Sequence, residues 1–246
     1  VVDKYSDQAH FIYELLQNAD DAKATKATFR LEKSELYFIH DGSVQFSVSN
    51  PQNEEADTEG GKLGHVNAIT SIANSNKTVS SIGKFGVGFK AVFQYTQTPH
   101  IYDPDFRFKI ERFIVPHLLA ADLEMRGSSE TVFRFPFDHK EIEPEASHDH
   151  ILKKLKSLEF PCLFLSSLKS VSFEAGGVLG EYTKEVTREL KQEDITVQWI
   201  TLALNGERTR HRLLVFTKNI DSNPCQDNVD SHPCSIGYEL GGKDGK

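Results

Sequence analysis

Apolar residues recur at helical spacing close to the start of the chain. The segment at 11–25 reads FIYELLQNADDAKAT, and its apolar spacing predicts a helix over residues 6–23. One side of this helix carries the apolar residues Ile12, Leu15, Leu16 and Ala19. The opposite side carries Glu14, Asn18 and Asp21, with Asp20 beside them. A polar helix face usually meets only water, so this stripe alone does not indicate a binding site.

Alternating patterns follow, and they predict strands. The runs KATFRL at 26–31 and ELYFIHD at 35–41 predict a hairpin across the three residues between them. Residues 42–63 are polar and predict a loop. A weak helical pattern at 66–73 and an apolar stripe at 89–93 flank a loop rich in serine and glycine.

Strand patterns dominate the rest of the chain. β-Branched and aromatic residues predict strands at 100–103, 106–113, 131–137, 162–173, 195–204 and 211–217. A helix is expected at 149–158, and the last thirty residues, rich in Asn, Asp, Pro and Gly, predict loose structure. Helices come early and strands late, which favours an α+β fold over a strictly alternating α/β fold. We predict one domain over 1–175 and a β-rich extension over 176–246, the start of a second module.

Composition narrows the class of protein. Hydrophobic residues make up 38% and charged residues 26%, as in soluble globular proteins, and no apolar run is long enough to cross a membrane. The net charge of −8 argues against nucleic-acid binding by this fragment. Three cysteines and no signal-peptide pattern favour an intracellular, cytoplasmic protein. The chain does not begin with methionine, so we expect it to be a segment of a longer protein.

A glycine-rich loop, GKFGVGFKA at 83–91, precedes the second helical stripe. Glycines before a helix bring backbone N–H groups close to a ligand, and the helix start adds unpaired donors, which suits a phosphate. The loop lacks the G-K-[ST] of a P-loop. Gly86, Gly88 and Ala91 fit a dinucleotide pattern, although the preceding KTVSSIGKF is a poor strand. A helix start with packing glycines is the structural alternative.

The helix and the loop together are far more specific than either alone. E-x-x-x-N-A-x-D-A on a helix, D-G after a strand and G-x-x-G-x-G-F before a second helix resemble, in that order, the GHKL ATPases. ELLQNADDA resembles their N-box, IHDG their adenine-side box and GKFGVGF their glycine box. SIANSNKT at 71–78 resembles the chaperone-type lid, and TVFRFPF at 131–137 resembles the late strand whose threonine lines the adenine pocket. In this form the boxes resemble those of sacsin-like and bacterial chaperone-like ATPase domains.

This resemblance implies a fold and a set of roles. The implied fold is the Bergerat ATP-binding fold, a two-layer α/β sandwich with a mixed, mostly antiparallel sheet and helices on one face. Glu14 is the implied catalytic residue, which orients or deprotonates water, and Asn18 the implied ligand of Mg²⁺. The implied nucleotide-binding residues are Asn18, Asp21, His40, Asp41, Gly42, Lys77, Gly83, Lys84, Phe85, Gly86, Val87, Gly88, Phe89 and Thr131.

One departure from the family pattern leaves the adenine contact open. The family writes its adenine-side box as D-x-G, whereas this chain reads His40-Asp41-Gly42. Either Asp41 receives the adenine amino group after a backbone shift, or His40 occupies the place of the family aspartate. The sequence favours Asp41, because a carboxylate is the natural acceptor for an amine. A solvated turn is the structural alternative.

Three functions fit these patterns. The first is a Mg²⁺-dependent ATPase with a mobile lid at 54–82 that drives conformational change in a chaperone-like protein. The second is a histidine-kinase catalytic domain, and the third is a nucleotide-sensing scaffold without turnover. ATP and ADP, an ATP-dependent homodimer and a protein client are the expected partners. Hydrolysis should be slow, because the boxes contain no arginine; Lys218 is a candidate for the missing cation, with a solvated strand end as its alternative.

Overall fold

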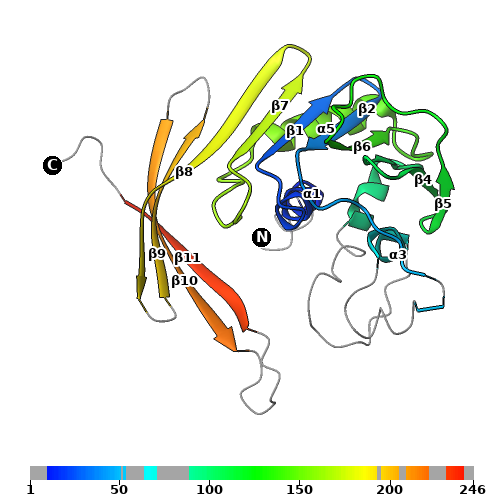
Figure 1. The fold of residues 1–246 in the computed structure, drawn as a ribbon. Helices are drawn as coiled ribbons and strands as arrows, with labels where there is room; N and C mark the ends of the chain where they lie inside the picture. Colours follow the sequence, from blue (N-terminus) through cyan, green and yellow to red (C-terminus); the bar gives the residue numbers. More distant parts are fainter. Residues whose placement is uncertain are drawn as a thin grey trace.

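A single eleven-stranded sheet organises the described part of the chain (Figure 1). The computed structural model describes residues 10–50, 52–53, 64–70, 89–192, 195–204, 209–221 and 231–240. The strand order is β11-β10-β9-β8-β7-β1-β2-β6-β3-β4-β5. Every neighbouring pair is antiparallel except β1 and β7, which are parallel. Together with a few helices, this sheet makes the fold α+β, as the sequence predicts.

The bounds of the elements are as follows. The strands are β1 (Lys26–Leu31), β2 (Glu35–His40), β3 (His100–Tyr102), β4 (Arg107–Glu111), β5 (Val115–Leu118), β6 (Thr131–Pro136), β7 (Ser170–Ala175), β8 (Val178–Gln192), β9 (Ile195–Leu204), β10 (Thr209–Asp221) and β11 (Ser231–Glu239). The described helices are α1 (His10–Asp21), α3 (His65–Thr70), the 3₁₀ helix η2 (Lys90–Gln94) and α5 (Pro144–Lys156).

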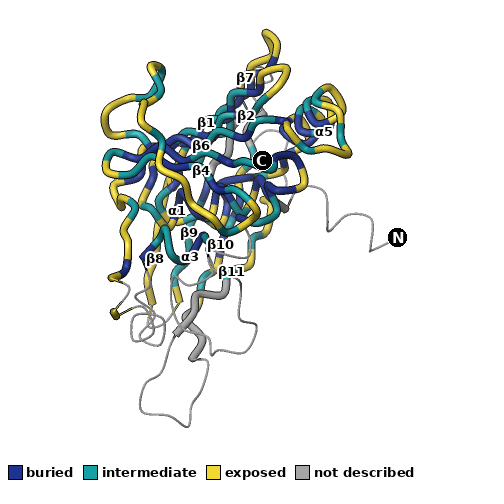
Figure 2. Tube along the Cα trace, turned by 90° about the vertical axis from the view of Figure 1, so that its right-hand side faces the viewer, coloured by how far each residue is buried: buried dark blue, intermediate teal, exposed yellow. Residues whose placement is uncertain are grey.

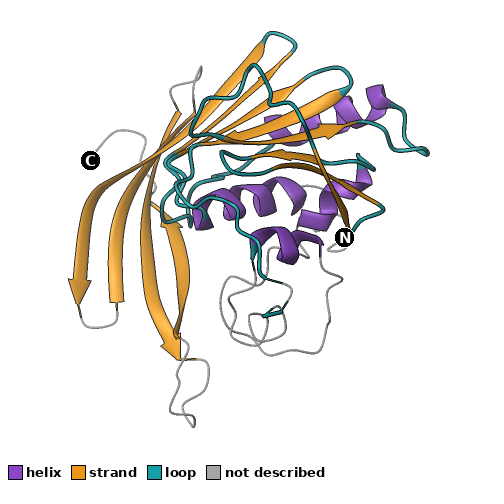
Figure 3. Cartoon of the chain, turned by 45° about the vertical axis from the view of Figure 1, so that its right-hand side comes forward, coloured by secondary structure: helices purple, strands orange, loops and turns teal. Residues whose placement is uncertain are grey.

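The main core lies against the strands β1, β2 and β6. In β1 and β2 every second residue is buried, as the period of a half-buried strand requires. Their inward side chains share one apolar cluster with residues of α1, η2 and α5, among them Leu15, Phe38, Phe89, Phe133 and Leu155. Figure 2 shows this buried interior in dark blue. Figure 3 shows that the far ends of β8–β11 extend away from the helices.

The first helix forms because its apolar side has a core to enter. Ile12, Leu15, Leu16 and Ala19 are all completely buried, as predicted. The helix ends where Lys23 adopts a left-handed backbone conformation with φ of 64°. The Lys23 N–H then bonds to the Asp20 carbonyl and the Ala24 N–H to the Ala19 carbonyl, which satisfies the last turn. The predicted start at residue 6 lies outside the described residues.

Several predicted elements are placed correctly and others are not. The hairpin of 26–31 with 35–40 and the strand at 195–204 match the prediction closely. Within the predicted strand at 162–173, only residues from 170 onward belong to a strand, β7. The predicted helix after the glycine loop is described from Phe89 onward: Phe89 is α-helical, and Lys90–Gln94 form the 3₁₀ helix η2.

The prediction of loose structure at the end of the chain is wrong for its described part. Residues 231–239 form β11, which pairs with β10 over nine residues. β8 was not predicted either, because its second half is exposed and rich in charged residues. In both strands the backbone partners, rather than an apolar pattern, hold the strand in place.

The predicted boundary at 175/176 falls in a tight turn. β7 and β8 form a hairpin there, whose turn residues Gly176 and Gly177 have positive φ angles of 55° and 83°. Beyond this hairpin a small second cluster gathers Leu163, Ile200, Leu213 and Val215. The division into two domains stays a prediction. No helix among the described residues has the length and apolar composition that crossing a bilayer requires.

Candidate functional site

The polar stripe of α1 contains a buried amide. Only 7% of Asn18 is exposed, and its side chain forms no hydrogen bond with a described residue. Among the described residues, Ser147 Oγ is the side-chain polar atom that is fully enclosed and has no partner. The Asn18 amide has no partner either, but it is not fully enclosed. Burial without a protein partner is unusual for an amide. Asn18 is therefore available to a small ligand, a water molecule or a cation.

The two carboxylates on the same stripe lie in wetter surroundings. Glu14, one turn before Asn18, is half-buried, and Asp21 is exposed. Partial desolvation and the neighbouring Asp20 charge raise the pKa of the Asp21 carboxyl, and Lys23 opposes this shift. A bound cation would relieve the charge repulsion that Asp21 experiences.

Asp20 belongs to the protein scaffold rather than to the stripe. Its Oδ1 accepts the N–H groups of Ser167 at 2.6 Å and Leu168 at 2.8 Å, and its Oδ2 accepts the N–H of Ser166 at 2.9 Å. The carboxylate therefore fastens α1 to the loop before β7. Asp21 was predicted to bind nucleotide, whereas the anchoring contacts at this end of α1 belong to its neighbour Asp20.

The turn after β2 is fastened to the end of α1. Asp41 Oδ1 accepts the N–H groups of Thr25 at 2.7 Å and Lys26 at 2.8 Å, and its Oδ2 accepts the Thr25 hydroxyl at 2.6 Å. These bonds lower the pKa of the Asp41 carboxyl despite partial desolvation. The Gly42 backbone approaches Ala22 so closely that an added Cβ would lie 2.8 Å from the Ala22 carbonyl oxygen. Two of the predicted boxes are thus neighbours in space.

His40 occupies the buried end of β2. It is 5% exposed, its ring lies about 6 Å from the rings of Phe38 and Phe133, and its Nδ1 accepts the Gly42 N–H at 3.1 Å. Burial lowers the pKa of His40 to about 4, although the Asp41 charge opposes the shift. His40 is therefore neutral at physiological pH.

Thr131 lies opposite His40 on the neighbouring strand. The two residues are cross-strand partners in the β2–β6 ladder, and Thr131 is 1% exposed. The Thr131 hydroxyl donates to Oδ2 of Asp103 at 3.0 Å, and Asp103 itself is completely buried directly after β3. Asp103 was not predicted from the sequence. Its one signal was a carboxylate directly after a strand, as at Asp41.

The described end of the glycine box reaches the same region. Phe89 is buried, and its ring lies 5.9 Å from that of Phe133, which in turn contacts His40. The structure thus brings together α1, the turn after β2, the start of β6 and Phe89. The other residues predicted from the glycine box and lid lie outside the described residues: Lys77, Gly83, Lys84, Phe85, Gly86, Val87 and Gly88.

Part of the predicted lid is docked on the protein. In α3, Ile69 is completely buried, and the Asn67 side chain accepts the Ser49 N–H at 2.8 Å. The Gly64 N–H donates to Ser49 Oγ at 2.8 Å, and there is no room for a Cβ at Gly64. The remainder of the predicted lid, 54–63 and 71–82, lies outside the described residues.

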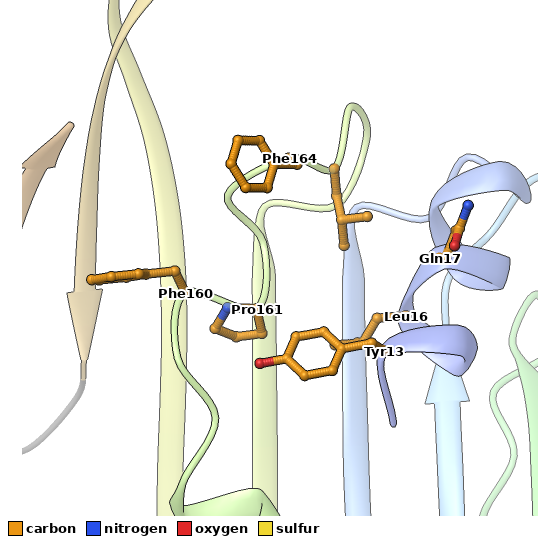
Figure 4. Close-up of a pocket in the computed structure, with 7 residues that line it drawn as sticks. Tyr13, Leu16, Gln17, Phe160, Pro161 and Phe164 are labelled. Atoms are coloured by element: carbon orange, nitrogen blue, oxygen red, sulfur yellow. The ribbon is translucent and has the colours of Figure 1, made fainter. Parts of the chain in front are cut away.

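A cavity of about 200 Å³ lies on a different side of α1 (Figure 4). Its lining residues are Tyr13, Leu16, Gln17, Phe160, Pro161, Phe164 and Leu165. None of these side chains is a carboxylate, a lysine or an arginine, so the cavity offers little to a phosphate or to a cation. It is therefore separate from the candidate site around Asn18.

A magnesium ion fits Asn18 only as part of a larger ligand set. No three His, Cys, Asp or Glu side chains of the described residues are grouped closely enough to hold a metal by themselves. Mg²⁺ commonly takes one or two protein oxygens and completes its shell with water and substrate phosphates. The open Asn18 oxygen suits that arrangement.

Comparison with known proteins points to one group of relatives. Residues 1–107 match the family model described as "Sacsin domain". Over 114 residues the chain is 33% identical to Protein NO VEIN of Arabidopsis thaliana, covering 44% of this chain and 4% of that protein. It is 31% identical over 119 residues to human Sacsin, covering 43% of this chain and 2% of that protein. The first part of the chain is thus similar to a sacsin domain, and it spans a small fraction of these relatives.

Proposed function

We propose that residues 1–175 form a GHKL-type module that binds ATP with Mg²⁺ and hydrolyses it slowly. The observation that carries the proposal is the buried, unpartnered amide of Asn18, one turn before Ala22, which the turn after β2 approaches closely. Closure of the module on nucleotide would then drive a conformational change in a larger protein. The same geometry serves a two-layer Bergerat sandwich, in which the inward face of β1, β2 and β6 meets the helices.

The order of the motifs and the comparisons support this assignment. All three predicted boxes, at 14–22, 39–42 and 83–89, lie within the 107 residues that match the sacsin domain model. The first two boxes are neighbours in space, and the last residue of the third contacts the same aromatic cluster. A set of motifs that are distant in sequence and adjacent in space is what a single ligand requires.

The stripe on α1 supplies the proposed chemistry. Bound Mg²⁺ would neutralise phosphate charge and align the terminal phosphate. Asn18 presents an amide oxygen to the cation, and Glu14, one turn away, orients or deprotonates the attacking water. Asp21 adds a second carboxylate at the exposed end of the stripe.

The base contact is better assigned to His40 than to Asp41. Both oxygens of Asp41 already accept hydrogen bonds from Thr25 and Lys26, and losing them would leave the start of β1 unsatisfied. His40 instead lies on the inward face of β2, opposite Thr131. We therefore propose His40 for the base contact, in place of the Asp41 that the sequence alone favoured.

Phosphate release with a Glu14 variant tests whether the module hydrolyses ATP. We expect the chain of residues 1–246 to turn over far more slowly than the roughly 10 per second of a median enzyme, because no arginine lies in the predicted boxes. Glu14→Ala should abolish the remaining turnover while ATP binding stays within about threefold, since Glu14 acts on water rather than on the nucleotide.

Glu32→Ala is the matched control, because Glu32 is an exposed glutamate in the turn between β1 and β2. Turnover should be unchanged in this variant. If wild type and Glu14→Ala bind ATP equally and neither releases phosphate, the module is a nucleotide-sensing scaffold and not an ATPase. Brisk turnover by the wild-type chain would contradict the expectation of an incomplete site.

A further inference from the structure

Two side chains at one end of the β2–β6 pair, on the face that packs on the core, present hydrogen-bonding groups of fixed direction. His40 and Thr131 are cross-strand partners, and both side chains are almost completely buried. Directly opposed residues on one face have Cβ atoms roughly 4.5–5.5 Å apart. The two groups can therefore contact adjacent atoms on the edge of one nucleobase.

His40 presents a donor. Its Nδ1 accepts the Gly42 N–H, so in the neutral ring the proton resides on Nε2. Burial keeps the ring neutral, since it lowers the pKa to about 4. Nε2 makes no hydrogen bond with a described residue, and it is not fully enclosed by protein atoms. An N–H donor thus remains available at the end of β2.

Thr131 presents an acceptor. Its hydroxyl proton points to the Asp103 carboxylate, so the Oγ lone pairs are what a ligand would meet. Asp103 is wholly buried, and its other carboxylate oxygen accepts only the Asp105 N–H at 3.2 Å among the described hydrogen bonds. Turning the hydroxyl away would deprive a buried carboxylate of a donor, which opposes that rotation.

A donor beside an acceptor matches one class of purine. On a 6-oxopurine such as guanine, the O6 atom accepts and the neighbouring N1–H donates. On adenine the order is reversed, because the N6 amine donates and N1 accepts. We propose that the His40–Thr131 pair reads the 6-oxopurine edge, so that the site binds GTP more tightly than ATP.

The contacts of Asp41 argue against a second acceptor for the base. A carboxylate at this end of β2 could accept the adenine amine, but both Asp41 oxygens bond to Thr25 and Lys26. The inference rests on the proposed function and changes only the base that the site prefers. It leaves the roles of Asn18 and Glu14 untouched.

Calorimetry with the chain of residues 1–246 and three Mg²⁺-nucleotides tests the proposal. GTP and ITP should bind at least tenfold more tightly than ATP; ITP carries the same O6 and N1–H edge without the 2-amino group. ATP binding as tightly as GTP, or more tightly, would overturn the base assignment while leaving the proposed function intact. Tight GTP with weak ITP would assign recognition to the 2-amino group and also overturn it. If none of the three binds, both proposals fail.

A substitution provides an independent check. His40→Asp replaces the donor with an acceptor, which would face the O6 acceptor of a 6-oxopurine, and should abolish the preference for GTP. His117→Asp is the matched control, because His117 is exposed on the edge strand β5, and it should keep the preference of the wild-type chain. An unchanged preference in a folded His40→Asp protein would contradict the role of His40. The nucleotide series with wild type remains decisive if that variant does not fold.

Discussion

At the scale of single residues, three neighbouring acidic groups have different roles that sequence spacing could not separate. Asp20 bonds to the loop at 166–168, Asp21 is exposed, and Asp41 holds the start of β1. The partners of Asp20 lie almost 150 residues away along the chain, so no local pattern reveals them. By contrast, the burial of the apolar side of α1 could be predicted, because it depends only on helical periodicity.

The anchoring role of Asp20 predicts a large loss of stability on truncation. Asp20→Ala removes three charge-assisted bonds and leaves backbone N–H groups of a part-buried loop unpaired, so we expect a loss of about 3 kcal/mol. Asp21→Ala, one residue along, should change the free energy of unfolding by less than about 0.5 kcal/mol. Urea denaturation measures both. Equal effects of the two substitutions would show that the contacts of Asp20 carry no special weight.

His40 predicts a pH dependence of stability. Its folded-state pKa of about 4 lies below the unfolded value near 6.5, so the unfolded chain binds a proton first as pH falls. The contribution of His40 to the free energy of unfolding is therefore complete above pH 6.5 and is lost as pH falls towards 4. At pH 5 the loss should be about 2 kcal/mol. His100 adds to the slope, since burial and then Arg134 and Lys109 also lower its pKa to about 4.

Urea denaturation of wild type and His40→Asn at pH 7 and pH 5 separates these contributions. The variant should lose less stability on acidification than wild type does, because Asn cannot take up the proton. The slope that remains should come from His100 and the other titrating groups. An identical pH dependence in the two proteins would mean that His40 is not kept neutral by burial.

At the scale of elements, the sequence predicted the helices and strands whose own apolar pattern determines their structure. The β1–β2 hairpin and β9 have clear apolar patterns and short connections. β8 and β11 form because neighbouring strands supply backbone partners, which a local pattern does not report. The apolar residues at 162–169 predict a strand. In the structure this segment is a loop, and Asp20 accepts backbone N–H groups at its end.

The docking of α3 revises the expectation of a mobile lid for residues 64–70. Ile69 is buried, and Ser47 and Ser49 bond to residues in or next to α3. Hydrogen exchange in the nucleotide-free chain should therefore be slow at the Ala68 amide, which donates to the Gly64 carbonyl at 2.9 Å. The exposed turn at 33–34 serves as the fast reference. Equally rapid exchange at Ala68 would mean that α3 opens readily and belongs to the lid.

At the scale of the whole molecule, one sheet connects the candidate site to the β-rich remainder. β8 pairs with β7 through its first half and with β9 through its second half, so the strands beyond β7 continue the sheet of the candidate site. Lys218, the candidate cation of the sequence analysis, is exposed on β10. Its role as a catalytic cation stays a prediction, as do the lid at 54–63 and 71–82, the homodimer and the client.

If Asn18 helps to hold Mg²⁺, nucleotide binding should depend on the metal, and calorimetry with ATP measures this dependence directly. Chelation with EDTA, or Asn18→Ala, should weaken binding at least tenfold, which corresponds to about 1.4 kcal/mol. Gln17→Ala, an exposed neighbour on the same helix, should bind ATP as wild type does. Equal ATP affinity with and without the metal, or an unaffected Asn18→Ala protein, would contradict the account.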